Sequence, residues 1–415
     1  MKNRMTAILH YSAPPVVGGV EVVIQAQARQ LVEHGYPAAV VAGWGEPTSL
    51  PAGVEWIWIP ELDTQHPRIL EINDVLSQGR MAAGFDTMVD HITAKLGQRL
   101  PEFENVLVHN ALTKDLNLAL TAALHRLLDH GAIRRCVAWC HDLNWSTPTK
   151  QPSGQLGRPW NLLRRYRPEV TYVAVSEARK VDLARVLGCA DECIQVIYNG
   201  VDPERLLGIS AEGADLIQRL DLLDSDLIML MPVRVARSKN IELALEVLAA
   251  LKTKDCRPKL VVTGPPSPND AVNLAYYGSL LALRQELGVE AEAHFVYEAG
   301  PDPDREYCID QKVVGDLYRV SDMLFMPSHR EGFGMPVLEA GIAGLPVVCT
   351  AVPAATEIGG RDLIRVRANA DPARVADTIL NRLRRNAQYR LRRRVRHGYT
   401  WQSLFESRIE PLLRS

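Results

Sequence analysis

Short apolar runs alternate with longer amphipathic segments along nearly the whole chain. The first run, Thr6–His10, precedes a loop and then a segment whose apolar residues recur every three or four positions up to Gly35. The next run, Ala38–Ala42, is again apolar throughout. Runs without polar alternation are typical of strands buried on both faces, and the longer period is that of a helix. This strand–helix–strand order predicts the α/β class, with a parallel sheet covered by helices.

The same pattern continues to the end of the chain. Further strands are predicted at Trp56–Ile59, Val106–His109, Cys136–Cys140, Tyr172–Val175, Ile194–Ile197, Leu227–Val233, Leu260–Thr263, His294–Tyr297, Met323–Met326, Val347–Cys349 and Leu363–Val366. Helices are predicted between them, with long ones at Leu62–Leu100 and Pro372–Arg396 and an amphipathic one at Trp401–Leu413. Periodicity weakens between Gly200 and Asp226, where we expect the junction of two domains.

Composition and charge narrow the class of protein. A chain of 415 residues is too long for one core, which agrees with two domains. The formal net charge is −2, so nucleic acid is not favoured as a partner. No uncharged apolar run is long enough to span a bilayer, and the first one ends too early for a signal peptide. The seven scattered cysteines then indicate reduced thiols in a cytoplasmic protein rather than disulfides or a metal site.

A strand, a glycine-rich turn and a helix start meet in the stretch Ser328–Ala340. The apolar run Met323–Met326 leads into it, and glutamates stand at positions 331 and 339. Unpaired backbone N–H groups and the helix dipole make such a turn an anion site. Glu331 and Glu339 would repel a bare phosphate but would accept hydrogen bonds from hydroxyl groups. The stretch therefore favours a nucleotide-sugar, although an acid in a first helical turn is also a common structural feature.

Other loops with candidate chemistry also follow predicted strands. Arg234 and Lys239 lie in a basic loop, Gly18-Gly19 forms a glycine pair, and His141 ends a strand of the first half. Parallel sheets bind ligands outside the carboxyl ends of their strands. Two doubly wound domains in series would create a cleft to which these loops contribute. A local hydrogen bond beside Asp142 is the alternative explanation for His141.

The chain resembles the retaining glycosyltransferases of family 4, which have the GT-B fold. The resemblance rests on Arg234-x4-Lys239, Glu331-x7-Glu339, Gly18-Gly19 and Asn199-Gly200-Val201-Asp202, and it covers essentially the whole chain. It implies two Rossmann-like domains facing a cleft. These would be an acceptor-binding domain at residues 1–203, a nucleotide-sugar-binding domain at 204–397, and a terminal helix at 398–415 that packs back on the first domain.

The resemblance also implies a role for each site residue. Arg234 and Lys239 would hold the diphosphate of the donor, where fixed cations stabilise the charge of the leaving group. Glu331 would accept from hydroxyls of the sugar and Glu339 from those of the ribose, while His141 would contact the sugar at the reacting centre. Further donor contacts, many of them through the backbone, are expected at Gly18, Gly19, Gly264, Val296, Gly332, Phe333, Gly334, Met335 and Pro336.

The implied reaction moves a hexosyl group from a UDP- or GDP-sugar to a hydroxyl of a glycan, lipid-linked or small-molecule acceptor. No cofactor is implied; Asp302-Pro303-Asp304 matches a metal-binding pattern of another glycosyltransferase fold, but cationic side chains already serve the phosphates. Ser146–Pro159 is an expected acceptor-binding loop. Arg158–Arg167 is an expected peripheral contact with the inner face of the membrane. The alternatives are a sugar-nucleotide epimerase of the same fold and a non-catalytic nucleotide-sugar-binding subunit.

Overall fold

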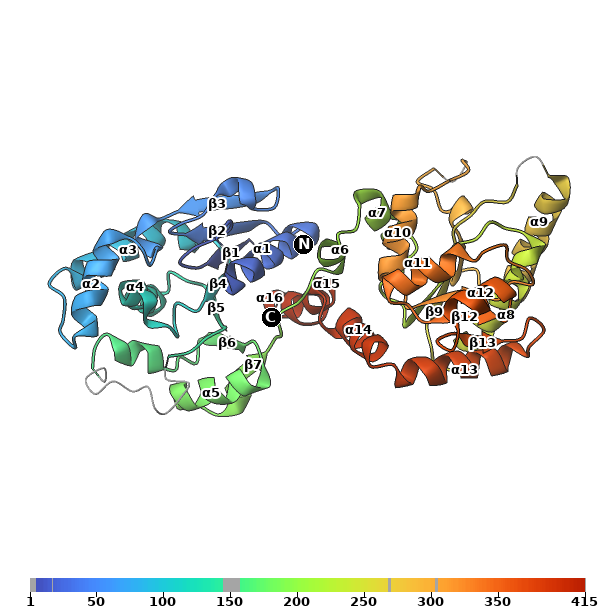
Figure 1. The fold of residues 1–415 in the computed structure, drawn as a ribbon. Coiled ribbons are helices and arrows are strands. Elements are labelled where there is room, and N and C mark those ends of the chain that lie inside the picture. Colours follow the sequence, from blue (N-terminus) through green and yellow to red (C-terminus); the bar gives the residue numbers. More distant parts are fainter. Residues whose placement is uncertain (1–4, 17, 145–156, 268–269, 303–304, 415) are drawn as a thin grey trace. The chain divides into compact units, whose positions relative to one another are not determined.

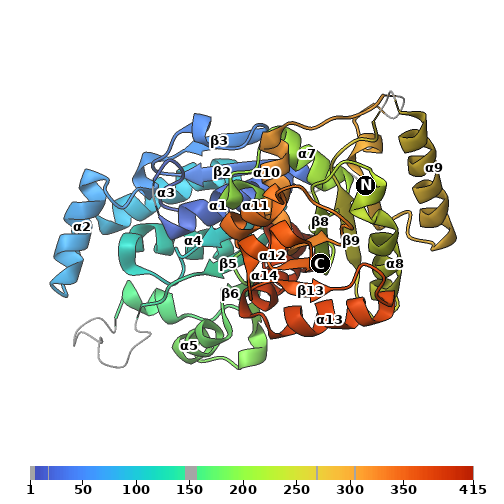
Figure 2. The same ribbon diagram turned by 45° about the vertical axis from the view of Figure 1, so that its right-hand side comes forward.

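The computed structural model describes residues 5–16, 18–144, 157–267, 270–302 and 305–414. The chain divides into two compact units: unit 1 is Met1–Val201 with Tyr399–Ser415, and unit 2 is Asp202–Gly398. Each unit contains one parallel sheet, and Figures 1 and 2 show helices along both sides of each sheet. The predicted α/β class, with two Rossmann-like units, is confirmed.

Unit 1 holds a seven-stranded sheet in the order β3-β2-β1-β4-β5-β6-β7. Its strands are β1 (Thr6–Leu9), β2 (Ala38–Ala42), β3 (Val54–Trp58), β4 (Asn105–His109), β5 (Arg135–Cys140), β6 (Val170–Ala174) and β7 (Ile194–Val196). Ala7 and Leu9 belong to the apolar cluster on one face, and Ile8 belongs to the cluster on the other. Because both faces are covered there, the inner strands β1 and β2 are buried along their whole length, as expected for a parallel sheet.

The helices of unit 1 follow the predicted pattern with one correction. They are α1 (Gly19–Glu33), α2 (Pro67–Ser77), α3 (Phe85–Arg99), α4 (Leu118–Asp129) and α5 (Glu177–Leu187), with short 3₁₀ turns between them. The single helix predicted across Leu62–Leu100 is wrong, since α2 and α3 are separate. Gly79, with a φ of +74°, takes up the left-handed conformation just past the end of α2, and α3 begins only after Gly84.

Unit 2 repeats the architecture with a six-stranded sheet in the order β10-β9-β8-β11-β12-β13. Its strands are β8 (Leu227–Met231), β9 (Pro258–Val262), β10 (Ala293–Phe295), β11 (Met323–Met326), β12 (Val347–Thr350) and β13 (Ile364–Val366). Its helices are α6 (Pro203–Leu207), α7 (Ala211–Arg219), α8 (Ile241–Lys252), α9 (Ala271–Glu286), α10 (Gln311–Val320), α11 (Met335–Ala343), α12 (Pro353–Gly359), α13 (Pro372–Arg385) and α14 (Ala387–Gly398). The helix predicted across Pro372–Arg396 breaks at Asn386, whose extended backbone ends α13 and whose side chain accepts from the N–H of Tyr389.

The chain returns to unit 1 for its last segments, α15 (Trp401–Leu404), the π-helical turn η10 (Phe405–Ile409) and α16 (Glu410–Arg414). Val201 and Thr400 form a parallel bridge at the crossing point. A Cβ on Gly200 would lie 2.8 Å from the Trp401 ring, so glycine is required for this approach. Trp401 and Phe405 join the apolar cluster that covers α1. The predicted return of the terminal helix is confirmed, and Gly200 of the Asn199–Asp202 motif serves it.

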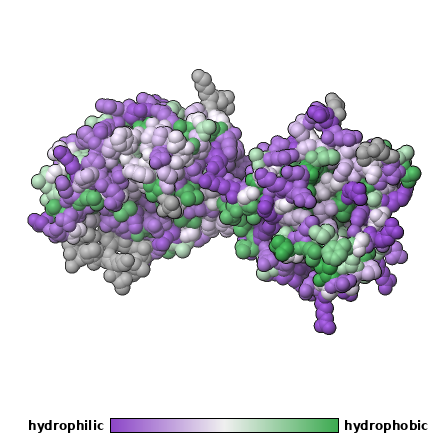
Figure 3. All heavy atoms as spheres, turned by 45° about the horizontal axis from the view of Figure 1, so that its top comes forward, coloured by the Kyte–Doolittle hydropathy of each residue, from purple (hydrophilic) through white to green (hydrophobic). Residues whose placement is uncertain are grey.

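No helix in the part of the chain that the structure describes combines the length and the apolar character needed to cross a bilayer. Hydrophilic residues cover most of the face shown in Figure 3, with smaller hydrophobic patches between them.

Candidate functional site

In unit 2, the loops that follow β8 and β11 meet where the strand order reverses. Succession along the chain runs from β8 outward to β9 and β10, whereas β11 lies on the other side of β8. Loops diverge at such a switch point and leave a place for a ligand at the carboxyl edge of the sheet. Here the two loops are tied together, because the carbonyl oxygen of Ser238 accepts from His329 N at 2.8 Å. Asn240 adds a hydrogen bond to Pro327 O at 3.0 Å.

Lys239 and Glu331 form an ion pair across these two loops. The Nζ atom of Lys239 lies 2.8 Å from both carboxylate oxygens of Glu331, and the Ser328 hydroxyl donates to Oε1 at 2.6 Å. The Glu331 side chain is only 8% exposed. The structure therefore brings together two residues for which the sequence suggested separate partners, and each fixes the position of the other.

Arg234 lies in the same loop as Lys239 but is exposed, and its guanidinium has no ion-pair or hydrogen-bond partner among the described residues. Its backbone is held by close packing against Gly264, which follows β9. A Cβ on Gly264 would lie 2.7 Å from Arg234 Cα, and the Gly264 N–H donates to Val233 O at 3.0 Å. Gly264 therefore has a structural role, because it fixes the Arg234 backbone. By contrast, Arg237 stacks over the Tyr276 ring at 4.8 Å.

A row of backbone donors opens between Glu331 and helix α11. The N–H groups of Gly332, Phe333, Gly334 and Met335 have no acceptor among the residues that the structure describes. Gly334 has a φ of +88° and begins the helix without a side-chain cap. Phe333 and Met335 are exposed, at 59% and 53%. Such a run of free donors at a helix N-terminus can accommodate an anion or a polar ligand.

Glu339 lies in the second turn of α11, because the helix begins at Met335 rather than at Val337 as predicted. The explanation of Glu339 as a first-turn acid is therefore wrong. Its Oε2 atom accepts from the hydroxyl of Tyr318 on α10 at 2.6 Å, while the residue as a whole is exposed. Tyr318 thus orients a carboxylate that remains accessible to solvent. Pro336, which has no N–H, lies in the first turn of α11. Glu339 had been expected in that same turn.

Val296 was predicted as a donor contact, and Asp302-Pro303-Asp304 matched a metal-binding pattern. Val296 follows β10 in the 3₁₀ turn η9 (Val296–Glu298), and its side chain is fully buried, so that only its backbone could reach a ligand. Residues 303–304 lie outside the described residues, as does most of the predicted acceptor loop Ser146–Pro159.

In unit 1, the glycine pair lies at the N-terminus of α1, next to a carboxylate of the chain itself. A Cβ on Gly18 would lie 2.1 Å from Glu21 Oε2, whereas one on Gly19 would meet nothing within 4 Å. Glu21 is buried, and Ser12 donates to its Oε1 at 2.6 Å. A side chain at position 18 would therefore displace the Glu21 carboxylate, while Gly19 leaves open space that a ligand could enter.

Histidines from successive strand ends gather at the carboxyl edge of this sheet. His10 follows β1, His109 ends β4 and His141 follows β5. The Nδ1 atom of His109 lies 2.9 Å from Nε2 of His141, and His10 Nδ1 donates to the His109 carbonyl at 3.0 Å. The backbone N–H of His141 is fixed in turn by the side-chain oxygen of Asn110 at 2.9 Å. The sequence pointed only to His141; His10 and His109 were visible as the last residues of predicted strands but were given no role.

Burial keeps these histidines uncharged. It lowers the pKa of His109 well below the usual range, and the neighbouring rings of His141 and His10 lower it further. Burial, with His10 nearby, also lowers the pKa of His141 to about 4. The pKa of His10 is lowered by burial as well, although the Glu21 carboxylate opposes the shift. At neutral pH the cluster therefore offers hydrogen bonds rather than positive charge.

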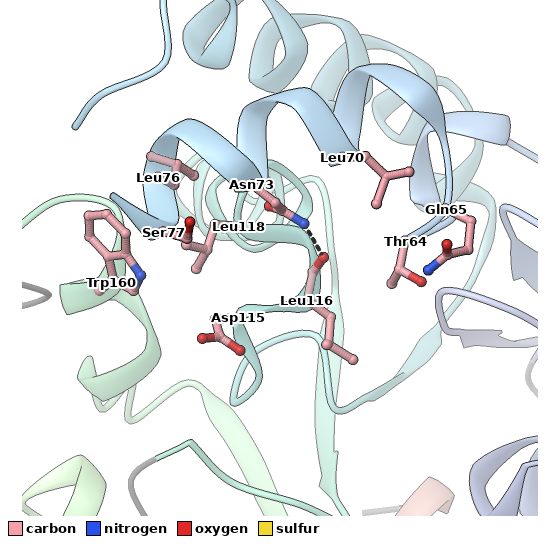
Figure 4. A pocket seen from close by; sticks show the side chains of 10 residues that line it. All are labelled: Thr64, Gln65, Leu70, Asn73, Leu76, Ser77, Asp115, Leu116, Leu118 and Trp160. Carbon is pink, nitrogen blue, oxygen red and sulfur yellow. Dashed lines mark hydrogen bonds between the residues drawn. The ribbon is translucent and has the colours of Figure 1, made fainter. Parts of the chain in front are cut away.

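A pocket of about 320 Å³ opens in unit 1 between α2, the segment after β4 and Trp160 (Figure 4). Figure 4 shows Leu70 and Asn73 on α2 above the segment that carries Asp115 and Leu116, with the hydrogen bond from Asn73 to Leu116 O at 2.8 Å. Its lining residues are Thr64, Gln65, Leu70, Asn73, Leu76, Ser77, Asp115, Leu116, Leu118 and Trp160. They include one carboxylate and no lysine or arginine, so the pocket favours a neutral polar ligand.

The basic segment Arg158–Arg167 does not present the apolar side chains that a membrane contact would use. Trp160 and Leu163 are buried in the core of unit 1, at 5% and 1% exposure. Arg158 pairs with Asp86 at 2.7 Å, and Arg167 pairs with Asp129 at 2.7 Å. Much of the positive charge of the segment is therefore balanced within unit 1.

Two family profiles match the chain, one for each half. The profile described as Glycosyltransferase Family 4 matches residues 17–205, and that described as Glycosyl transferases group 1 matches residues 214–395. The first ends and the second begins close to the boundary between the two units.

Curated relatives match over part of their length. A D-inositol 3-phosphate glycosyltransferase of Streptomyces bingchenggensis is 30% identical over 190 residues, which are 45% of this chain and 38% of that protein. The mannosylglucosylglycerate synthase of Petrotoga mobilis is 23% identical over 272 residues, 61% of this chain and 60% of that protein. The chain thus spans about half the length of these relatives. The crystal structure of HepE from Anabaena with UDP-glucose aligns over 100% of both chains at 17% identity and with a TM-score of 0.36.

Proposed function

Since the chain belongs to the family 4 glycosyltransferases, we propose that it moves a hexosyl group from a UDP- or GDP-sugar to an acceptor hydroxyl with retention at the anomeric carbon. The observation that supports the proposal is the set of side chains and backbone donors in the candidate site of unit 2. There an unpaired Arg234, the Lys239–Glu331 pair and the free N–H donors of Gly332–Met335 lie on loops at the switch point of the sheet. Cations and carboxylates side by side fit a ligand with both phosphate and hydroxyl groups.

In the proposed reaction, the cationic side chains serve the diphosphate of the donor and the carboxylates serve its hydroxyl groups. In the reaction the bond from the anomeric carbon to the phosphate breaks, a bond to the acceptor oxygen forms on the same face, and the acceptor proton passes to the leaving diphosphate. Arg234 and Lys239 would stabilise the negative charge that grows on the diphosphate. A phosphate near Lys239 competes with Glu331 for the ammonium group, which frees Glu331 to accept from sugar hydroxyls. Glu339, held by Tyr318, would accept from the ribose.

The pocket of unit 1 favours an acceptor without a phosphate group. Asp115 is its only charged lining residue, and the indole N–H of Trp160 has no hydrogen-bond partner among the described residues. A phosphorylated acceptor, as the name of the Streptomyces relative implies for that enzyme, would place an anion beside Asp115 with no cation in the lining. A neutral, hydroxyl-rich acceptor would instead find polar partners and an aromatic ring.

The test begins with donor binding. Addition of the correct UDP-, GDP- or ADP-sugar should raise the melting temperature through mass action, and EDTA should not abolish the effect. The same donor is then incubated with a neutral polyol and with its monophosphate. We expect transfer to the neutral acceptor, with the donor's anomeric configuration kept in the product as read by NMR coupling constants. Failure of every donor to bind would contradict the proposal, and an inverted product would contradict retention.

Incubation with the donor alone separates the alternatives. A transferase without acceptor should at most hydrolyse the donor slowly. An epimerase would convert the sugar of the donor, and a non-catalytic subunit would bind the donor and leave it intact even with acceptor present.

A further inference from the structure

A buried chain of hydrogen bonds links helix α1 to His141. The Oε1 atom of Gln27 lies 3.0 Å from Nε2 of His109, and Nδ1 of His109 lies 2.9 Å from Nε2 of His141. The two imidazole planes differ by only 20°, so an N–H of one ring can point along the lone pair of the other. Gln27 is 1% exposed and His109 is fully buried, so bulk water does not compete for these bonds.

The group that bonds Nε2 of His109 determines which ring nitrogen carries the proton in His109 and in His141. His109 is neutral because it is buried, and a neutral imidazole has one donor and one acceptor. The carbonyl oxygen of Gln27 can only accept, so Nε2 of His109 must donate to it. The Nδ1 atom of His109 then accepts, and Nε2 of His141 is its donor. A neutral His141 is left with the lone pair of Nδ1 for a ligand.

We propose that Gln27 is a positioning residue that, through His109, holds His141 in the tautomer that accepts a hydrogen bond at Nδ1. The inference rests on the proposed function, in which the partner of Nδ1 is a hydroxyl group of the donor sugar or of the acceptor. A fixed acceptor orients such a hydroxyl, which would otherwise rotate freely.

Packing alone does not explain a glutamine at this position. The Nε2 atom of Gln27 is buried without a hydrogen-bond partner, which costs stability that an apolar side chain of similar length would avoid. A turned amide would reverse every donor along the chain and make His141 a donor at Nδ1, so the orientation of one amide group determines what His141 offers to a substrate.

The tautomers can be read directly from the full-length protein labelled with 15N-histidine. Long-range proton–nitrogen correlations distinguish a ring protonated at Nε2 from one protonated at Nδ1, and the signals of His141 are identified by their loss in His141→Asn. We expect wild-type His141 to be protonated at Nε2. We expect Gln27→Met, which keeps the side-chain length but removes the acceptor, to move His141 toward the Nδ1-protonated form. The matched control is Gln30→Met, because Gln30 lies one turn further along α1 and bonds Glu33 instead.

A wild-type His141 protonated at Nδ1, or an unchanged pattern in Gln27→Met, would overturn the inference. In the transfer assay, Gln27→Met should reduce turnover about tenfold, the worth of one hydrogen bond, whereas Gln30→Met should not. If neither wild type nor variant transfers sugar, the proposed function fails, while the tautomer measurement still decides the role of Gln27.

Discussion

At the scale of single residues, the Lys239–Glu331 pair fixes the positions of two side chains in the candidate site of unit 2. The sequence indicated a phosphate-binding lysine and a sugar-binding glutamate, and the structure adds that the two groups contact each other at 2.8 Å. A largely buried carboxylate needs a counter-charge, so the pair with Lys239 keeps Glu331 in place. Any change at Lys239 should therefore alter the position of Glu331 as well as the proposed phosphate contact.

Lys239→Ala is expected to lower turnover about 100-fold, which is the order of effect seen when one stabilising group is removed from a developing anion. Circular dichroism should show an intact fold. Steady-state kinetics with the identified donor checks the expectation. Arg237→Ala is the matched control, because Arg237 lies in the same loop but stacks on Tyr276. Equal turnover in wild type and Lys239→Ala would remove Lys239 from the proposed site.

Gln27 and His109 were not predicted as site residues, because sequence patterns do not show which buried polar groups bond each other. Gln27 looks like one of several polar positions on an amphipathic helix, and His109 looks like the end of an apolar run. Their hydrogen bond joins positions 82 residues apart. Periodicity describes which face of an element is buried, but not which buried polar groups meet.

At the scale of elements, three loops share the carboxyl edge of the unit 2 sheet. The loop after β9 supplies Gly264, which packs against the backbone of the loop after β8, and that loop is bonded to the one after β11. The sequence placed each loop correctly after its strand. It placed the start of α11 two residues too late, because Pro336 and the left-handed Gly334 resembled a turn rather than the first helical residues.

Gly264→Ala should destabilise unit 2, since the new methyl group would lie 2.7 Å from the Arg234 backbone. Overpacking of this kind costs about 1–3 kcal/mol, enough to lower the melting temperature by several degrees. Gly332→Ala provides the contrast: a Cβ there meets nothing within 4 Å and the backbone is not left-handed, so its melting temperature should equal that of wild type. Calorimetry of both variants decides, and a Gly264→Ala protein as stable as wild type would contradict the close-packing argument.

At the scale of the whole molecule, the same doubly wound architecture occurs twice with different polar groups at the carboxyl edge. Unit 2 has cations, carboxylates and free N–H groups there. Unit 1 has neutral histidines and a pocket whose lining is uncharged apart from Asp115.

The buried histidines also make the stability of the chain depend on pH. Those with a lowered pKa are His10, His109, His125 and His141 in unit 1 and His294 and His397 in unit 2.

We expect stability to fall as the pH drops from about 6.5 to about 4. Below the ordinary histidine pKa of about 6.5, the unfolded chain binds protons that the folded chain does not, and the pKa values of His125 and His141 are lowered to about 4. Their contribution is complete above about pH 6.5 and is lost toward pH 4, at up to about 1.4 kcal/mol per pH unit for each group. Denaturant unfolding between pH 4 and 8 measures the slope.

A variant tests the assignment of this slope. His125 bonds Leu162 O at 3.1 Å, so His125→Gln, which keeps a donor, should make the pH dependence shallower by up to the contribution of one group. His130→Gln changes an exposed histidine of the same helix end and should leave the slope as it is. Stability that stays constant down to pH 4.5 would contradict the burial of these rings.

The sequence by itself determined most of the elements, their α/β order, the fold of each unit and the identity of Arg234, Lys239, Glu331 and Glu339 as candidate site residues. These features are local: they depend on the period of apolar residues and on short spacings. The tertiary structure decided the strand orders that create the switch points, the pairing of Lys239 with Glu331, and the Gln27–His109–His141 chain. These depend on contacts between segments far apart along the chain, and such contacts form only when the sheets assemble.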